Sequence, residues 1–177
     1  MALLRERGID VHLTVAGPAD RIYPEHAEEL RALVKELDLT ARVHVGWIEN
    51  LGEIYGSARV VALASRERPG GAPSEGAPTV LMEGMAHGRP VVAPLEAGIA
   101  EVVGDCGTLV SERTPAGFAD ALEPYLRDPK LAAEVGRRGS ERAERLFSFD
   151  RTMQTLTGLY EELSGAASID RPGQAAA

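Results

Sequence analysis

Short apolar runs alternate with helical patterns along most of the chain, and this alternation limits the possible folds more than any other feature. Patterns typical of helices cover 25–38, 51–57, 78–87, 114–127, 130–147 and 150–163. Apolar runs typical of β-strands cover 11–16, 43–45, 59–64, 90–93 and 107–110. Alternation at this spacing predicts an α/β sandwich, in which helices cover a parallel sheet.

The pattern also predicts which side chains are buried. The run 59–64 is continuous and apolar after its first residue, as in a strand that is buried on both faces. The helix 25–38 has one apolar stripe that we expect to face the core, formed by Leu30, Leu33, Val34 and Leu37.

One folded domain followed by a tail is the organisation that the sequence predicts. Residues 65–73 lack periodicity and are expected to form a loop within the domain. From Gly165 onward the residues are typical of a mobile terminus. We therefore expect one domain over 1–164 and a flexible tail over 165–177.

Composition excludes several classes of protein. Of 177 residues, 44% are hydrophobic, which is enough for a core and excludes wholesale disorder. No apolar run approaches the roughly 18 residues that a membrane-spanning helix needs, and no hydrophobic stretch follows a basic opening. We therefore expect neither a membrane-spanning nor a secreted protein. The net charge of -8 argues against nucleic acid as a partner. Cys106 is the one cysteine and cannot form an internal disulfide, so we expect a cytoplasmic protein.

Ligands of parallel α/β sheets bind at the carboxyl ends of the strands, where the most informative segment of this sequence lies. Glu75 and Glu83 are eight positions apart, and a turn with a proline separates them. The turn leaves backbone amides free at a helix N-terminus, which favours anionic ligands, and a carboxylate readily accepts hydrogen bonds from a vicinal diol. The alternative is a helix whose acidic first turn merely complements the helix dipole.

This segment resembles the Glu-x7-Glu signature of retaining glycosyltransferases of family 4, whose GT-B fold consists of two Rossmann-like domains. Further landmarks of that family's C-terminal domain follow in the same order over 11–163. They are the turn 15–17, the strand 43–47, the helix end and strand 55–65, the turn 88–92, the runs 98–103 and 107–110, and the closing helices at 126–129 and 147–160. The resemblance implies a Rossmann-like parallel sheet sandwiched by helices, as one half of a GT-B fold.

The resemblance implies a hexosyltransferase that uses a nucleotide-diphospho-sugar and transfers the sugar, with retention, to an acceptor hydroxyl. Glu75 would be the catalytic residue, facing the hexose hydroxyls near the reacting carbon, and Glu83 would hold the ribose hydroxyls. The segment between them would bind the sugar or phosphate, and its donor-binding residues would be Gly76, Ala77, Pro78 and Thr79. The nucleotide-sugar is the donor substrate, so no cofactor is expected. No metal site is expected either, because the sequence has no Asp-x-Asp and no metal-ligand spacing.

Other donor contacts implied by the resemblance have simpler alternatives. Gly17 would belong to the donor site, and the backbone of Gly46 to Ile48 would frame the nucleobase beside Trp47, which is alternatively a partly buried core aromatic. Two loop arginines are candidates for phosphate binding, although a solvated loop is the simpler interpretation; they are Arg66 and Arg68.

Three further features are given structural interpretations. His87 is expected to cap a helix C-terminus, where a cation is favourable. Gly84 stands inside a helix and indicates close packing near Glu83. The arginines and glutamates of 134–145 alternate at helical spacing and predict an exposed, ion-paired face.

The departures from the family lie at the start of the chain. Residues 1–8 read as the end of a helix, whereas the family has before that helix a strand and a turn with an arginine and a lysine that clamp the diphosphate. We therefore expect an N-terminally incomplete sheet with an exposed edge. The expected partner is an acceptor-binding N-terminal domain or subunit, and any peripheral membrane contact would be made through it. The isolated chain would then be inactive. The alternatives are a non-catalytic nucleotide-sugar-binding subunit and a GT-B epimerase.

Overall fold

The computed structural model describes residues 1–17, 25–65 and 76–164, and within them strands and helices alternate as predicted. The strands are β1 (Leu13–Ala16), β2 (Val43–Gly46), β3 (Val61–Ala62), β4 (Val91–Pro94) and β5 (Gly107–Val110). The helices are α1 (Ala2–Glu6), α2 (Glu25–Glu36), α3 (Leu51–Ser57), α4 (Thr79–Ala86), α5 (Ala97–Val103), α6 (Pro115–Arg127), α7 (Pro129–Phe147) and α8 (Phe149–Ser164). Helix α5 was not among the predicted helices, because its short apolar run carries a glycine near its start.

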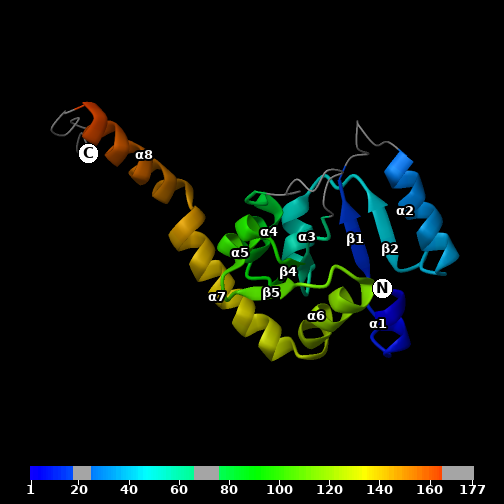
Figure 1. Cartoon of the computed structure of the whole chain (residues 1–177). Helices are drawn as coiled ribbons and strands as arrows, with labels where there is room; N and C mark the ends of the chain where they lie inside the picture. The colour runs from blue at the N-terminus through cyan, green and yellow to red at the C-terminus, as the bar shows by residue number, and fades with distance from the viewer. Residues whose placement is uncertain (18–24, 66–75, 165–177) are drawn as a thin grey trace, which may run out of the picture.

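The strands form two separate parallel sheets, with the orders β1-β2 and β3-β4-β5. In Figure 1, β1 lies on the side of β2 that is nearer to the three-stranded sheet. Among the described residues, β1 and β3 each pair with one strand only, so each keeps an unpaired edge. The predicted α/β class with parallel strands is confirmed. The sequence predicted one sheet with an exposed edge, and its division into two sheets was not predicted.

The core belongs mainly to the three-stranded sheet. Strand β4 is buried along its whole length, and α4, α5, α6 and α7 pack around it. The largest side chains that are fully buried here include Leu81, Met85 and Ile99. At the turn after α4, α7 comes so close that a Cβ on Gly136 would lie 2.0 Å from the carbonyl oxygen of Gly88.

The two-stranded sheet has a thinner cover than the sequence pattern predicted. Helix α2 packs on β2 but buries none of its residues fully, and Leu33 of the predicted stripe is 48% exposed. Leu37 is exposed as well, so the prediction of one buried stripe is wrong. The reason is that a two-stranded sheet offers too little apolar surface to cover a stripe of this width.

Strand β3 is shorter and more open than predicted. Its pairing with β4 covers Val61 and Ala62 only, although the apolar run extends over 59–64. Val61 is buried, whereas Ala62 and Ala64 are exposed, so the strand is not buried on both faces as expected. Strand β3 is an edge strand of its sheet among the described strands.

Helix α1 connects the two parts of the molecule. Arg5 donates hydrogen bonds to the carbonyl oxygens of Leu37 and Asp38, after α2. Arg7 pairs with Asp120 and with Glu123 on α6, at 2.7 and 2.8 Å. Arg5 lies in α1 and Arg7 is its C-cap, so α1 and its C-terminal residue connect the two-stranded part to α6.

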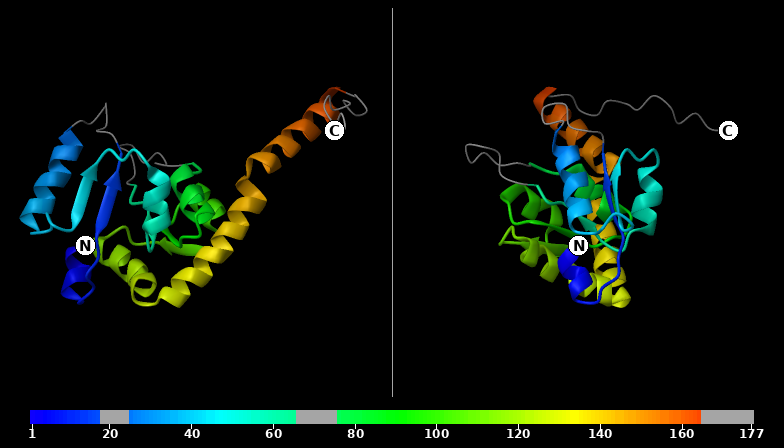
Figure 2. Two further views of the ribbon diagram at one scale, coloured as in Figure 1. Left: turned by 180° about the vertical axis from the view of Figure 1, so that it is seen from behind. Right: turned by 90° about the vertical axis from the view of Figure 1, so that its right-hand side faces the viewer.

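Helix α7 packs along α4 and α6, and α8 follows it and projects away from the rest of the molecule (Figures 1 and 2). Asp128 caps the N-terminus of α7 and Thr114 that of α6. Helix α8 has no buried residue, and its exposed apolar side chains are Phe149, Met153, Leu156, Leu159, Tyr160 and Leu163. Among the described residues, no helix combines the length and apolar character needed to cross a membrane.

Candidate functional site

Glu83 projects from α4 beside the hydroxyl of a buried tyrosine. Helix α4 begins after Pro78, and its apolar side chains Leu81 and Met85 anchor it in the core. This leaves Glu83 on the exposed side, facing α3. The hydroxyl of Tyr55, on α3, donates a hydrogen bond of 2.7 Å to Oε2 of Glu83. Glu83 is exposed, and its predicted contact with the ribose hydroxyls stays a prediction.

Tyr55 was not among the residues that the sequence indicated. It is only 9% exposed and belongs to the same core cluster as Val61 and Leu81. Burial first, and then the hydrogen bond to Glu83, raise the pKa of Tyr55 to about 12. At neutral pH the hydroxyl is therefore a neutral donor. A signal was present in the sequence, since a buried tyrosine needs a partner for its hydroxyl.

His87 completes this group of side chains. It is the C-cap of α4, as predicted, and its Nδ1 lies 2.8 Å from the carbonyl oxygen of Glu83. Its ring stacks on that of Tyr55, with ring centroids 5.1 Å apart. The imidazole therefore holds the tyrosine ring against the end of the helix that carries Glu83.

Gly84 explains how α4 comes so close to β3. A Cβ at this position would lie 3.0 to 3.2 Å from the side-chain carbons of Val61. The interpretation that Gly84 marks close packing near Glu83 is confirmed. The glycine lets the helix, and the carboxylate with it, lie directly over the strand.

The predicted donor-binding segment before α4 lies against the start of α5. Gly76 and Ala77 are exposed, and the N-cap residue Pro78 provides no side-chain hydrogen bond to the helix. A Cβ on Gly98 would lie only 1.9 Å from the carbonyl oxygen of Gly76, so the two backbones touch. The segment therefore lies beside the loop that follows β4, at the carboxyl end of that strand.

Gly17, predicted in the donor site, follows β1, and the residues predicted near the nucleobase, Gly46 to Ile48, lie at the end of β2 and just after it. The amide of Gly17 donates a hydrogen bond of 3.0 Å to the carbonyl oxygen of Gly46. Ile48 is half-buried, while Trp47 is 70% exposed, so the alternative of a core aromatic is wrong. The contact of Trp47 with a nucleobase stays a prediction.

The structure thus gathers the predicted residues into separate groups. Glu83 lies with Tyr55 and His87, the segment from Gly76 lies against α5, and Gly17 lies with Gly46. The remaining predicted residues lie outside the described ranges. They are the catalytic candidate Glu75 and the phosphate candidates Arg66 and Arg68.

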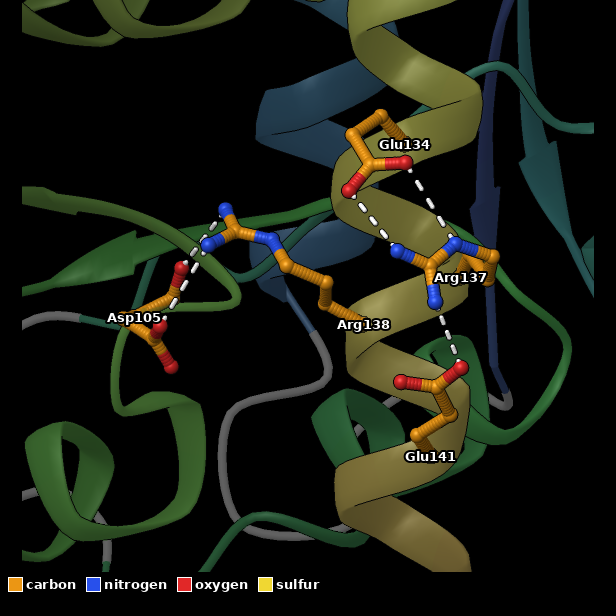
Figure 3. Close-up of polar contacts among 5 residues, drawn as sticks. All are labelled: Asp105, Glu134, Arg137, Arg138 and Glu141. Carbon is orange, nitrogen blue, oxygen red and sulfur yellow. Dashed lines mark hydrogen bonds and ion pairs between the residues drawn. The ribbon is translucent and has the colours of Figure 1, made fainter.

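The ion-paired face predicted on α7 is only partly as expected. Figure 3 shows Arg137 between Glu134 and Glu141, at 2.8 and 2.6 Å. Arg138 instead reaches Asp105, at 3.3 Å, in the turn after α5. Arg142 likewise donates to carbonyl oxygens at the end of α5. These two arginines fasten α7 to α5 and do not form surface pairs along the helix.

Two other features bear on the chemistry. Cys106 is buried, and burial followed by the hydrogen bond to Asp105 raises the pKa of its thiol, so it is not an activated nucleophile. The described part of the chain contains no cluster of three or more His, Cys, Asp or Glu residues suited to a metal ion.

Solved structures of glycosyltransferases share this fold. Sucrose-phosphate synthase from Thermosynechococcus elongatus has a TM-score of 0.75 and 28% identity, over 94% of this chain and 42% of that one. Alr3699/HepE of Anabaena, in complex with UDP and glucose, has a TM-score of 0.74 and 23% identity, over 88% of this chain and 41% of that one. The architecture is thus that of a domain from a glycosyltransferase.

The sequence comparison specifies the family. The model of the family described as "Glycosyl transferases group 1" matches residues 1–128, and the chain belongs to that family. D-inositol 3-phosphate glycosyltransferase of Geodermatophilus obscurus is 30% identical over 177 aligned residues, which cover 96% of this chain. The match covers 37% of that relative, so the chain spans little more than a third of its length.

Proposed function

We propose that this chain is the donor-binding half of a retaining, metal-independent hexosyltransferase whose donor is a nucleotide-diphospho-sugar. Membership of the glycosyltransferase family supports the reaction class. The observation that carries the assignment of the site is the exposed Glu83 carboxylate, which lies in the middle of α4 and accepts a hydrogen bond from Tyr55. In this proposal Glu83 binds the two ribose hydroxyls of the donor, because a carboxylate can accept a hydrogen bond from each.

The segment before α4 binds the sugar or the diphosphate. Gly76 and Ala77 are exposed, and they lead into the N-terminus of α4, where amide groups and the helix dipole favour negative charge. As the bond to the sugar breaks, negative charge develops on the leaving phosphate, and fixed amide donors stabilise it. Glu75, the neighbour of Gly76 in the sequence, is the proposed catalytic residue that orients the sugar or stabilises charge on its ring.

The donor contact is tested by isothermal titration calorimetry of this chain with UDP, GDP and ADP. We expect one nucleoside diphosphate to bind, and Glu83→Ala to weaken it about tenfold or more, as for a lost hydrogen bond to a charged group. The matched control is Glu144→Ala, which removes an exposed glutamate from α7. Equal affinity of the wild-type and Glu83→Ala proteins contradicts the ribose contact.

We further propose that an N-terminal acceptor-binding half completes the enzyme. The unpaired edges of β1 and β3 support this proposal. An open groove of about 420 Å³ lies at the amino ends of the same two strands, lined by Val11, Arg59 and other residues. The exposed apolar side chains of α8 supply a second surface for such a partner. The short span of the chain relative to its curated relatives agrees with it.

An activity assay tests this second proposal. We expect the purified chain to transfer no sugar from UDP-glucose or GDP-mannose to acceptor hydroxyls, even where calorimetry shows that the nucleotide binds. Product analysis by mass spectrometry and nuclear magnetic resonance measures transfer, and also an isomerised donor sugar. Transfer by the chain alone contradicts the need for a second half.

A further inference from the structure

The hydroxyl of Tyr55 contacts one oxygen of Glu83 and leaves the rest of the carboxylate available. The hydrogen bond ends on Oε2. A carboxylate has about four lone-pair sites on its two oxygens, so Oε1 and one site of Oε2 remain for a ligand. Glu83 is exposed, and an exposed glutamate without such a bond samples several rotamers. The tyrosine therefore restricts where the free oxygen points.

The tyrosine is itself held on several sides. Its ring is in the core cluster with Val61 and Leu81, and it stacks on His87 at 5.1 Å. The imidazole is in turn placed by its contact with the carbonyl oxygen of Glu83, at 2.8 Å. Because Gly84 has no side chain, α4 packs closely against Val61. Because the Tyr55 side chain is buried and packed, its hydroxyl has one fixed position beside the Glu83 carboxylate.

We propose that Tyr55 is a positioning residue for the donor nucleotide, whose hydroxyl holds the Glu83 carboxylate in the orientation that accepts the vicinal hydroxyls of the ribose. This inference rests on the proposed ribose contact of Glu83 and adds a residue that acts through it. A fixed carboxylate binds a diol more tightly than a mobile one, because less conformational freedom is lost on binding. Tyr55 contributes in this way without touching the nucleotide.

The test compares ribonucleotides with 2′-deoxyribonucleotides. Calorimetry measures the affinities of UDP, GDP and ADP and of their 2′-deoxy counterparts for the wild type and for Tyr55→Phe. The matched control is Tyr125→Phe, which also removes one hydroxyl from a buried tyrosine, there bonded to Thr108 at 2.9 Å. A purely structural role of Tyr55 would change both affinities together. A positioning role changes their ratio.

We expect the wild type to prefer the ribonucleotide, and Tyr55→Phe to lose about tenfold of its affinity for the ribonucleotide alone. Tyr125→Phe should keep the wild-type ratio. If Tyr55→Phe keeps that ratio too, the positioning role is wrong and the ribose contact of Glu83 stands. If the wild type binds no nucleotide, or binds the ribonucleotide and the 2′-deoxyribonucleotide equally, the ribose contact of Glu83 is wrong. The positioning role of Tyr55 is then wrong as well.

If circular dichroism shows that Tyr55→Phe does not fold, a second variant is tested in its place. Replacement of Tyr55 by 4-aminophenylalanine keeps the ring and places a weaker donor at the same position. We expect it to lower the preference for ribose only in part. An unchanged preference overturns the positioning role.

Discussion

At the scale of single residues, Tyr55 makes a prediction about pH. Its folded pKa of about 12 lies above the ordinary value of 10.0, because burial and the bond to Glu83 both favour the protonated hydroxyl. The contribution of this group to stability is therefore fully present below about pH 10 and is lost as the pH rises through about 12. We expect the free energy of unfolding to fall over this range more steeply for the wild type than for Tyr55→Phe.

Urea unfolding between about pH 9 and about pH 12 measures this difference, and ultraviolet absorbance follows tyrosinate formation in the same samples. Tyr125→Phe is the reference, because this substitution removes the hydroxyl of another buried tyrosine. Parallel stability curves for the wild type and Tyr55→Phe would show that Tyr55 ionises alike in the folded and unfolded states.

At the scale of elements, α7 and α8 offer a comparison of two glycines inside helices. A Cβ on Gly136 of α7 would lie 2.0 Å from the carbonyl oxygen of Gly88, whereas a Cβ on Gly158 of α8 would have no neighbour within 4 Å. Alanine favours either helix by about 1 kcal/mol, but overpacking costs about 1–3 kcal/mol. We expect Gly136→Ala to destabilise the protein, and Gly158→Ala to leave it unchanged or to stabilise it.

Urea unfolding followed by circular dichroism measures both variants against the wild type. Each glycine serves as the control for the other, because the gain in helix propensity is common to both. A Gly136→Ala protein as stable as the Gly158→Ala protein would mean that α7 does not rest on the turn at Gly88.

At the scale of the whole molecule, the break between the sheets predicts two levels of stability. Strand β4 is buried throughout, while the two-stranded sheet is covered by α2 without a fully buried residue on that helix. Helix α1 packs on α6 through a buried apolar cluster that includes Leu4 and Ala119. Its contact with the end of α2 consists of hydrogen bonds and an ion pair of the exposed Arg5, which are worth little individually. We expect amides of β1 and β2 to exchange through smaller opening reactions than amides of β4 and β5.

Native-state hydrogen exchange, resolved by residue, measures these opening free energies. Equal protection of β1 and β4 would indicate one cooperative unit. If the proposed N-terminal half binds here, its addition is expected to raise the protection of β1 and β2, because β1 has an unpaired edge among the described strands.

The sequence predicted the positions of helices and strands better than it predicted the exposure and contacts of their side chains. Period and turn residues located every strand and most helices, because these signals depend on neighbours along the chain. The exposure of Leu33, Ala62 and Ala64 was not predicted, since it depends on how much sheet lies beside them. Likewise, Glu83 was singled out by its spacing, but its partner Tyr55 is 28 positions away on another helix. That contact is set by the packing of α3 against α4, which no local pattern encodes.

The position of Trp47 determines what optical methods can report about this protein. It is the single tryptophan of the chain, and it lies 70% exposed in the turn after β2. An indole that is in water in the folded protein changes its emission little on denaturation, so its fluorescence is a poor signal of unfolding. A molecule that binds at the carboxyl ends of β1 and β2 would quench the fluorescence of the same indole or shield it from water.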